Sequence, residues 1–150
     1  MPRFAYDCAL RWSDLDAFGH VNNARFLTLY EEARVALMFT AAREAGVTSF
    51  EEGVVVARHE IDYLRPVDYG PYLPGSLRAP HVRIETWVDE LRLASFQLAY
   101  ELVADGVVAS RARTVLVPYN LATRQPRRIS AAEQAYLRSW LEPEPLRVAT

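Results

Sequence analysis

This chain of 150 residues has one cysteine and no lysine. The cysteine count limits the possible disulfides, and the basic residues limit the possible partners. Cys8 is the only cysteine, so an internal disulfide is impossible and a reducing compartment is favoured. All 17 basic residues are arginine, against 19 acidic residues, which gives a formal net charge of -2. A surface that binds nucleic acid needs a basic excess, so we expect no nucleic-acid partner.

Long hydrophobic runs are also missing. No apolar run approaches the ~18 residues that a membrane span requires, and no basic segment with an apolar one opens the chain. We therefore expect a cytoplasmic protein with no membrane insertion. With 51% hydrophobic residues, a chain of this length can bury a single core. We expect one domain over residues 1–141 and a mobile tail over residues 142–150, which carries two prolines.

Several motifs for cofactors and metals do not occur. The patterns GxGxxG, GxxxxGK[ST] and GxSxG are absent. The chain therefore lacks the loops that bind dinucleotides and nucleotide phosphates, and the nucleophile elbow that carries a catalytic serine. His59 begins an HExxH zinc pattern, but its fifth position is Tyr63. Residues 14–19 resemble an EF-hand start, but Arg25 stands where the closing glutamate belongs. We expect no metal and no cofactor.

Hydrophobic periodicity predicts a strand, a loop and a long helix in the first third of the chain. Apolar residues alternate from Phe4 to Trp12, and Cys8 shares their face, so we expect a buried thiol rather than a nucleophile. Residues 13–22 break the alternation and read as a loop. From Asn23 the period becomes 3.6, with Gly46 as the stop, which predicts a helix of about 22 residues and about 33 Å. The stripe that we expect to be buried contains Phe26, Leu29, Tyr30, Ala33, Leu37 and Thr40.

Strand patterns and turn signals fill most of the remaining sequence. Residues 104–107 form a hairpin turn signal, and residues 66–80 hold four prolines and two glycines, which predicts an ordered loop. Ser130 and Glu133 have capping-box spacing, so a short helix is expected from Ser130 through Leu141. The order predicts an α+β domain with a five-stranded antiparallel sheet wrapped around the long helix. The four later strands are expected at Gly53–Leu64, Val82–Val88, Leu93–Val103 and Val107–Val117.

The loop before the long helix carries the residues with the clearest chemistry. Asp16, His20, Asn22 and Asn23 place a carboxylate, an imidazole and amides beside the free N–H groups of a helix N-terminus. Such a terminus stabilises developing negative charge, as acyl chemistry requires. The alternative is that Asp16 or Asn22 only forms a turn or caps the helix.

The pattern D-x-D-x-x-G-H-V-N-N at residues 14–23, followed by a helix with Tyr30, Glu31 and Arg34, resembles hot-dog-fold acyl-CoA thioesterases of the 4-hydroxybenzoyl-CoA thioesterase type. The resemblance covers roughly residues 4–129. Supporting segments lie at residues 61–66, 84–88, 95–96 and 111–114.

This resemblance implies a single hot-dog domain that hydrolyses an acyl-CoA thioester to a carboxylic acid and CoA. It makes Asp16 the nucleophile or general base and the backbone N–H of Asn23 the group that polarises the thioester carbonyl. The thiolate leaving group needs little protonation, so these groups suffice without a metal. The family's site lies between subunits, which implies a homodimer or homotetramer.

The roles of four further residues stay open on the sequence alone. His20 either assists in the site or ties the loop to backbone carbonyls, and Asn22 either orients substrate or caps the helix. Glu31 is an alternative base, since another thioesterase branch uses a helix carboxylate, or it forms an ordinary i,i+3 pair with Arg34. We expect His59 to be packed on its strand face.

Coenzyme A carries phosphates that guanidinium groups match with paired hydrogen bonds. The candidates are Arg65, Arg124, Arg127 and Arg128, against the alternative of a solvated basic turn. Phe26, Tyr30 and Tyr63 either line the acyl pocket or fill the core. Two rival functions remain: a hot-dog enoyl-thioester hydratase or dehydratase that uses His20, and a non-catalytic acyl-CoA-binding protein.

Overall fold

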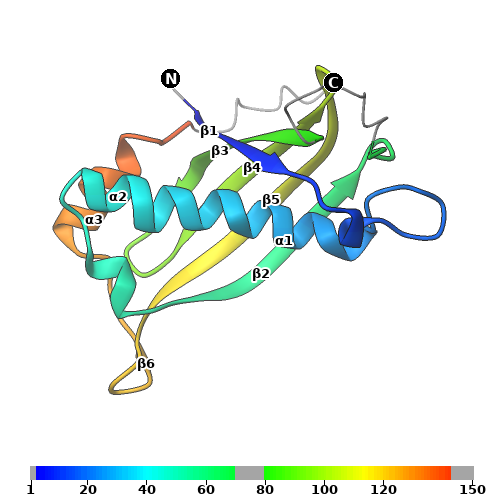
Figure 1. The fold of residues 1–150 in the computed structure, drawn as a ribbon. Helices are drawn as coiled ribbons and strands as arrows, with labels where there is room; N and C mark the ends of the chain where they lie inside the picture. Colours follow the sequence, from blue (N-terminus) through cyan, green and yellow to red (C-terminus); the bar gives the residue numbers. More distant parts are fainter. Residues whose placement is uncertain (1–2, 70–79, 143–150) are drawn as a thin grey trace, which may run out of the picture.

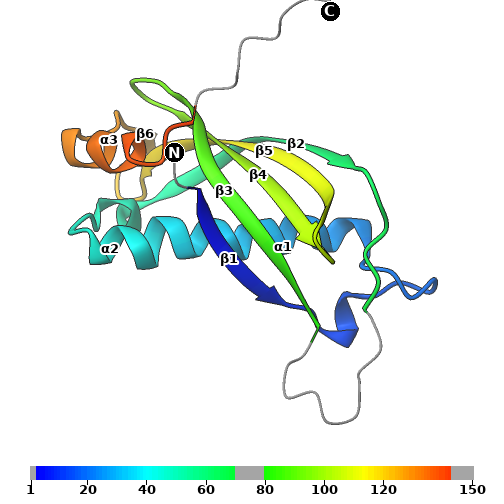
Figure 2. The ribbon, with the colours of Figure 1, turned by 90° about the horizontal axis from the view of Figure 1, so that it is seen from above.

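The computed structural model describes residues 3–69 and 80–142, and its dominant element is one long helix. This helix runs through α1 (Asn23–Val35), a π-helical segment (Ala36–Ala41) and α2 (Ala42–Glu44). It lies along the concave side of a curled sheet (Figures 1 and 2). The chain leaves it through Gly46, whose φ of +84° suits the stop predicted there. The predicted long helix is therefore confirmed.

The buried stripe of this helix changes phase inside the π-helical segment. The predicted positions from Phe26 to Leu37 are buried, but Thr40 is exposed, so that part of the prediction is wrong. A π-helical turn holds more residues than an α-helical turn, which rotates the later side chains around the axis. Met38 and Ala42 are buried instead.

The sheet is antiparallel in the order β1-β3-β4-β5-β2. Its hairpin turn has positive φ at both Asp105 and Gly106, as predicted for the turn between the last two long strands. The five predicted strands are confirmed. Within residues 3–69 and 80–142 there is one further strand that was not predicted, the two-residue β6, which pairs with β5. The bounds are β1 Phe4–Ala9, β2 Val54–Tyr63, β3 His81–Leu91, β4 Phe96–Ala104, β5 Val107–Asn120 and β6 Gln125–Pro126.

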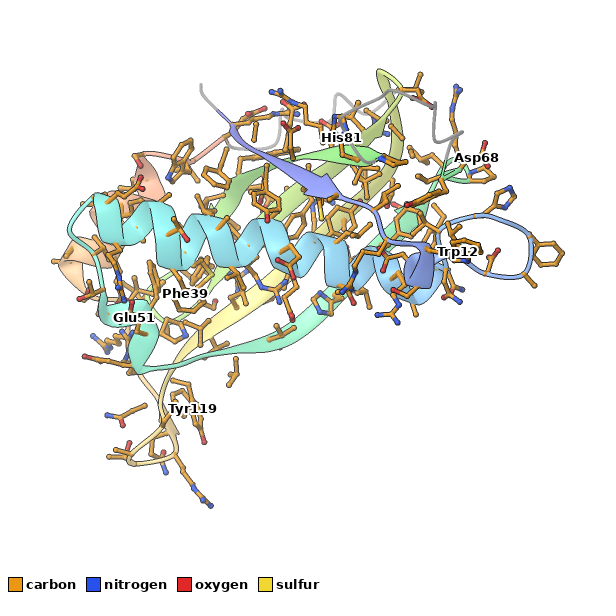
Figure 3. The ribbon with its side chains drawn as sticks, in the orientation of Figure 1. Trp12, Phe39, Glu51, Asp68, His81 and Tyr119 are labelled. Carbon is orange, nitrogen blue, oxygen red and sulfur yellow. The ribbon has the colours of Figure 1, made fainter. Side chains whose placement is uncertain are left out.

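The first strand is shorter than predicted. It ends at Ala9, and a 3-10 turn at Trp12–Asp14 follows, in which Trp12 is 82% exposed (Figure 3). The turn forms because the Asp14 carboxylate accepts a hydrogen bond from the Arg11 N–H (2.8 Å). Cys8 is buried as predicted, and burial raises the pKa of its thiol to about 11, so it is a poor nucleophile.

The edge strand β2 is the least covered of the five main strands of the sheet. Most of its residues are exposed, because the long helix crosses the inner strands and leaves this edge open (Figure 1). His59 is among them, which corrects the expectation that it is packed. Within the described chain, β2 pairs only with β5, with a bulge between Val56 and Arg58.

A short helix, α3 (Ala131–Arg138), closes the end of the sheet near α2. Its predicted capping box is present, with the Ser130 side chain accepting from the Glu133 N–H. The helix ends at Arg138 rather than at Leu141, because the following chain turns to β3, where the Val88 N–H donates to the Trp140 carbonyl (2.9 Å).

Two predictions fall largely outside the described residues. Residues 70–79 of the predicted loop at 66–80 are not among them, nor are residues 143–150 of the predicted tail. In the part that is described, no helix combines the length and the apolar character needed to cross a membrane.

Candidate active site

The loop before α1 is closed around Asp16. The Asp16 N–H donates to the His20 carbonyl (2.8 Å), and the carboxylate Oδ1 accepts from the backbone N–H groups of Phe18 (2.9 Å) and His20 (3.2 Å). Gly19 has a φ of +75°, which lets the chain turn within this short loop. The backbone thus holds the Asp16 carboxylate through its Oδ1.

Asp14 occupies a different environment in the same loop. It is buried, its Oδ2 holds the Arg11 N–H, and its backbone carbonyl accepts from the Asn22 N–H (2.8 Å). These contacts fasten the loop to the start of α1. Asp16 is only half-buried, so of the two carboxylates it is the more accessible one.

A pocket of about 610 Å³ lies between this loop and the end of β2. It brings together five of the residues that the sequence analysis proposed for the site. They are Asp16, His20, Asn22, Asn23 and Arg65. The other lining residues are Val21, Phe26, Tyr63, Leu64 and Pro66. A carboxylate, an imidazole and a helix N-terminus therefore face one open cavity with apolar walls.

The N-terminus of α1 is capped in a way that suits an oxyanion. The Asn22 side chain accepts a hydrogen bond from the Ala24 N–H (2.9 Å), so Asn22 is an N-cap, as one of the two alternatives predicted. Asn23 is the first helical residue, and its N–H is one of those that have no acceptor within the helix. It lies in the pocket with the partial positive charge of the helix end.

Two aromatic residues join the strand and the helix beside the pocket. The Tyr63 hydroxyl donates to the Asn23 carbonyl (2.7 Å), and its ring meets Phe26 edge to face at 5.1 Å. Both residues line the pocket, whereas Tyr30 is in the core and donates to Ser110 (2.7 Å). From the sequence, each of the three residues could line the pocket or fill the core. In the structure Phe26 and Tyr63 line the pocket, and Tyr30 is part of the core.

His20 contacts a carboxylate rather than a backbone carbonyl. Its Nε2 lies 3.3 Å from Oδ1 of Asp68, and the neighbouring Val21 N–H donates to the Val67 carbonyl (2.8 Å). The residues beyond β2 thereby hold the loop around Asp16. No sequence signal linked residue 20 with residue 68.

Glu31 lies two turns into α1 and is not among the residues that line this pocket. Its side chain is 61% exposed and is 3.4 Å from the Arg34 guanidinium, so the i,i+3 ion pair is present. Of the two candidate carboxylates, Asp16 lines the pocket and Glu31 does not.

The arginine candidates are split between the two ends of the molecule. Arg65 lines the pocket, whereas the segment around β6 lies at the opposite end of the long helix (Figures 1 and 2). There Arg124 and Arg128 are exposed. Arg127 instead donates to the Glu133 carboxylate (2.7 and 2.9 Å) and to the Ser49 carbonyl (3.0 Å).

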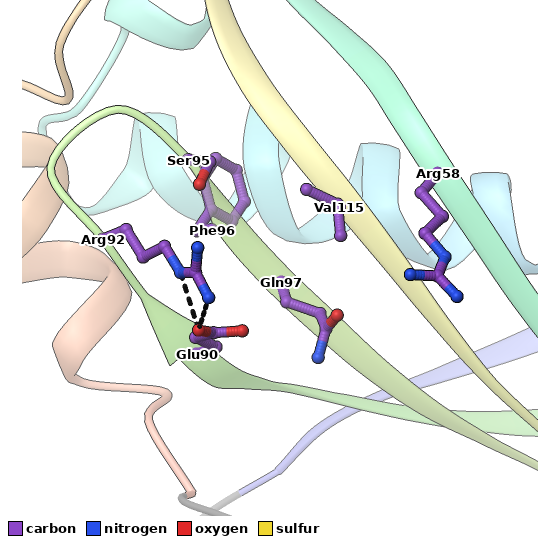
Figure 4. Close-up of a pocket in the computed structure, with 7 residues that line it drawn as sticks. All are labelled: Arg58, Glu90, Arg92, Ser95, Phe96, Gln97 and Val115. Carbon is purple, nitrogen blue, oxygen red and sulfur yellow. Dashed lines mark hydrogen bonds and ion pairs between the residues drawn. The ribbon is translucent and has the colours of Figure 1, made fainter.

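A second pocket of about 250 Å³ opens over the strands and contains none of the proposed site residues. Figure 4 shows its two arginines, of which Arg92 pairs with Glu90 (2.6 Å). Arg58 is paired with Glu60. Both charges are thus balanced within the chain.

Comparison with known proteins identifies the family and the fold. The sequence matches the model of the thioesterase-like superfamily over residues 10–141. The chain belongs to the thioesterase-like superfamily. No curated protein sequence matches it. This thioesterase-like chain is nonetheless similar to many solved structures.

Three of these structures show the range of the similarity. A predicted thioesterase from Bacillus stearothermophilus has a TM-score of 0.78 and 24% identity, covering 96% of this chain and 100% of its own. A Thermus thermophilus thioesterase in complex with coenzyme A and Zn has a TM-score of 0.73 and 29% identity, over 91% and 92%. A Synechocystis 1,4-dihydroxy-2-naphthoyl-CoA thioesterase has a TM-score of 0.72 and 16% identity, over 91% and 96%. The predicted hot-dog fold and thioesterase resemblance are confirmed.

Proposed function

We propose that the protein is an acyl-CoA thioesterase with Asp16 as its catalytic carboxylate. The observation that carries this proposal is that Asp16 and the first N–H groups of α1 face one pocket in a thioesterase-like chain. The Thermus thermophilus structure with bound coenzyme A supports a CoA thioester as substrate, because that chain is 29% identical to this one.

The proposed reaction follows from the groups in the pocket. Asp16 either attacks the thioester carbonyl or takes a proton from an attacking water, and negative charge moves to the carbonyl oxygen. The Asn23 N–H donates to that oxygen, because the Asn22 cap serves the next amide, that of Ala24. The C–S bond then breaks and CoA leaves as a thiolate. If Asp16 has attacked, the acyl–Asp16 anhydride is cleaved by water to the carboxylic acid and free Asp16; if water has attacked, the acid forms directly and the proton held by Asp16 passes to the thiolate or to solvent. These steps use no cofactor and no metal.

A homodimer would complete the proposed site. The free edge of β2 is a surface for strand pairing, and a two-fold axis through it would place the start of one β2 beside the end of the other. The β6 end of the partner would then approach the loop around Asp16. Arg124 and Arg128 of that end, together with Arg65, are the proposed contacts of the CoA phosphates, while Arg127 stays with Glu133.

We expect light scattering at micromolar concentration to give twice or four times the 17.1 kDa mass of the chain. The reason is that β2 exposes hydrogen-bonding groups and apolar side chains that a second copy would cover. A species of 17.1 kDa alone would contradict the proposed dimer and tetramer.

We expect the purified protein to release free thiol from acyl-CoA thioesters, measured spectrophotometrically with a thiol reagent over short, medium, long and aromatic acyl groups. At least one class should be hydrolysed. Hydration of an enoyl-CoA without thiol release would instead favour the hydratase function. Binding of acyl-CoA without any turnover would favour a non-catalytic binding protein.

A further inference from the structure

The side-chain nitrogen of Asn22 has no hydrogen-bond partner in the described chain, whereas the other polar atoms of this residue are all bonded. The Asn22 N–H donates to the Asp14 carbonyl (2.8 Å), and the Asn22 carbonyl accepts from the Arg25 N–H (2.9 Å). Its Oδ1 accepts from the Ala24 N–H (2.9 Å). Among the described residues, nothing accepts from Nδ2. Both N–H groups of Nδ2 are therefore left to donate to a ligand.

The helix cap determines which way this amide points. Only oxygen can accept from a backbone N–H, so the contact with Ala24 places Oδ1 on the helix side and directs Nδ2 away from it. Asn22 is half-buried and lines the pocket together with Asp16 and Asn23. Nδ2 is not one of the enclosed polar atoms that lack a partner. It is therefore accessible to a substrate in this pocket.

A hydrogen bond at the other end of the first helical peptide strengthens this arrangement. The Tyr63 hydroxyl donates to the Asn23 carbonyl (2.7 Å), which belongs to the same peptide group as the Ala24 N–H. Tyr63 and the Oδ1 of Asn22 thus bond to the two ends of one peptide unit. Hydrogen bonds in series polarise one another. The series draws electron density toward Oδ1, which makes the Nδ2–H groups of Asn22 better donors.

We propose that Asn22 is a catalytic residue, whose Nδ2–H donates to the thioester carbonyl oxygen beside the Asn23 N–H. The two residues are adjacent in the chain and both line the pocket, so a side-chain donor and a backbone donor lie together at the start of α1. Such donors stabilise the negative oxygen that forms when a carbonyl is attacked. This inference rests on the proposed function and adds a second donor to its oxyanion site.

The choice of asparagine at this cap agrees with the proposal. Aspartate and serine cap a helix about as well as asparagine does. An aspartate at residue 22 would offer no donor and would place a second negative charge beside the oxyanion. A serine would offer no amide. Capping alone thus leaves three residue types equivalent, whereas the donor role distinguishes asparagine from the other two.

Asn22→Ser is the main test, because the serine oxygen can still accept from the Ala24 N–H. We expect the midpoint of chemical denaturation to stay close to that of the wild type. The kcat for thiol release should fall by about 100-fold, the effect of one lost oxyanion donor. KM should change little, because the contact strengthens only in the transition state. An unchanged kcat would overturn the proposal, and the thioesterase function would stand.

Asn22→Asp removes both N–H groups while keeping the shape of the side chain and the acceptor for Ala24, so kcat should fall at least as far. Asn120→Asp is the matched control. Its Oδ1 accepts from the N–H groups of Ala122 (2.9 Å) and Thr123 (3.1 Å), and Asn120 does not line the pocket. This control should leave kcat unchanged. Equal losses of kcat in the two variants would overturn the proposal.

The pH profile of kcat separates a contact with substrate from a contact with Asp16. Asp16 keeps its hydrogen bonds from the Phe18 and His20 N–H groups in Asn22→Ser, so kcat should fall by the same factor at every pH. A shift of the acidic limb would show that Asn22 acts on the ionisation of Asp16 instead. That result would overturn the proposal.

Proton NMR of the Asn22 side-chain amide gives a readout that does not depend on turnover. A CoA ketone, with CH2 in place of the thioester sulfur, keeps the carbonyl oxygen, whereas an alkyl thioether of CoA lacks it. We expect the ketone alone to move one Asn22 amide proton downfield. Equal responses to the two probes would overturn the proposal. If the wild type released no thiol from any thioester, the proposed function and this inference would both fail.

Discussion

Asp16→Asn is expected to slow thioester hydrolysis by on the order of 100-fold or more, the contribution of a positioned acid or base group. Asparagine keeps an oxygen that can accept from the Phe18 and His20 N–H groups, so the loop should keep its shape. The charge and basicity of the carboxylate are lost. The kcat for thiol release measures the effect, while circular dichroism and light scattering check fold and assembly.

Asp14→Asn is the matched control for this substitution, because Asp14 lies in the same loop but is buried against the Arg11 N–H. It should lower the free energy of unfolding more than it lowers kcat. The assignment would be wrong if Asp16→Asn kept a near-normal kcat while Glu31→Gln abolished turnover. In that case the helix carboxylate would be the catalyst.

Glu133→Gln is expected to lower the free energy of unfolding by about 3 kcal/mol, the cost of leaving one partner of a buried ion pair unpaired. Glu133 is 0% exposed, and its carboxylate accepts from both terminal nitrogens of Arg127 and from the Ser130 N–H. The amide cannot balance the guanidinium charge. Chemical denaturation of the two proteins measures the difference.

The pH dependence of unfolding checks the same group. Burial disfavours the charged carboxylate, but the hydrogen bonds from Arg127 and Ser130 outweigh it and lower the pKa of Glu133 from 4.5 to about 2. The folded pKa therefore lies below the unfolded one. The stabilisation should be complete above about pH 4.5 and disappear as the pH falls toward 2, and Glu133→Gln should lack this loss.

Glu51→Gln is the control for Glu133, because Glu51 pairs with Arg43 at the surface, where both side chains are well exposed. Its effect on the free energy of unfolding should stay within about 0.5 kcal/mol. Equal effects of the two substitutions would show that the buried Glu133–Arg127 pair contributes no more to the free energy of unfolding than the surface pair of Glu51 and Arg43.

Local signals predicted most of the fold. The 3.6-residue period from Asn23, the turn at residues 104–107 and the Ser130 capping box each depend on neighbours in sequence, and each element is present. The phase change near Thr40 was not predictable, because a π-helical turn leaves the apolar composition unchanged. Nor did the sequence show that the helix leaves β2 uncovered, since coverage depends on how the layers are placed.

The candidate site was predictable to the extent that it is continuous in the chain. Asp16, His20, Asn22 and Asn23 lie in one short segment, so recognising the segment located the pocket wall that they form. The contact of His20 with Asp68 depends on where the chain returns after β2.

The hydrogen bond from the Tyr63 hydroxyl to the Asn23 carbonyl links the edge strand β2 to the start of α1. This bond joins one end of β2 to Asn23, the first residue of α1, whose N–H is a proposed oxyanion donor. Among the described residues of one protomer, β2 is hydrogen-bonded to a neighbouring strand on one side, by β5. A second copy that paired with the free edge of β2 would restrict the motion of this strand. Assembly would thereby also restrict the position of the Asn23 amide relative to the carbonyl that it is proposed to polarise.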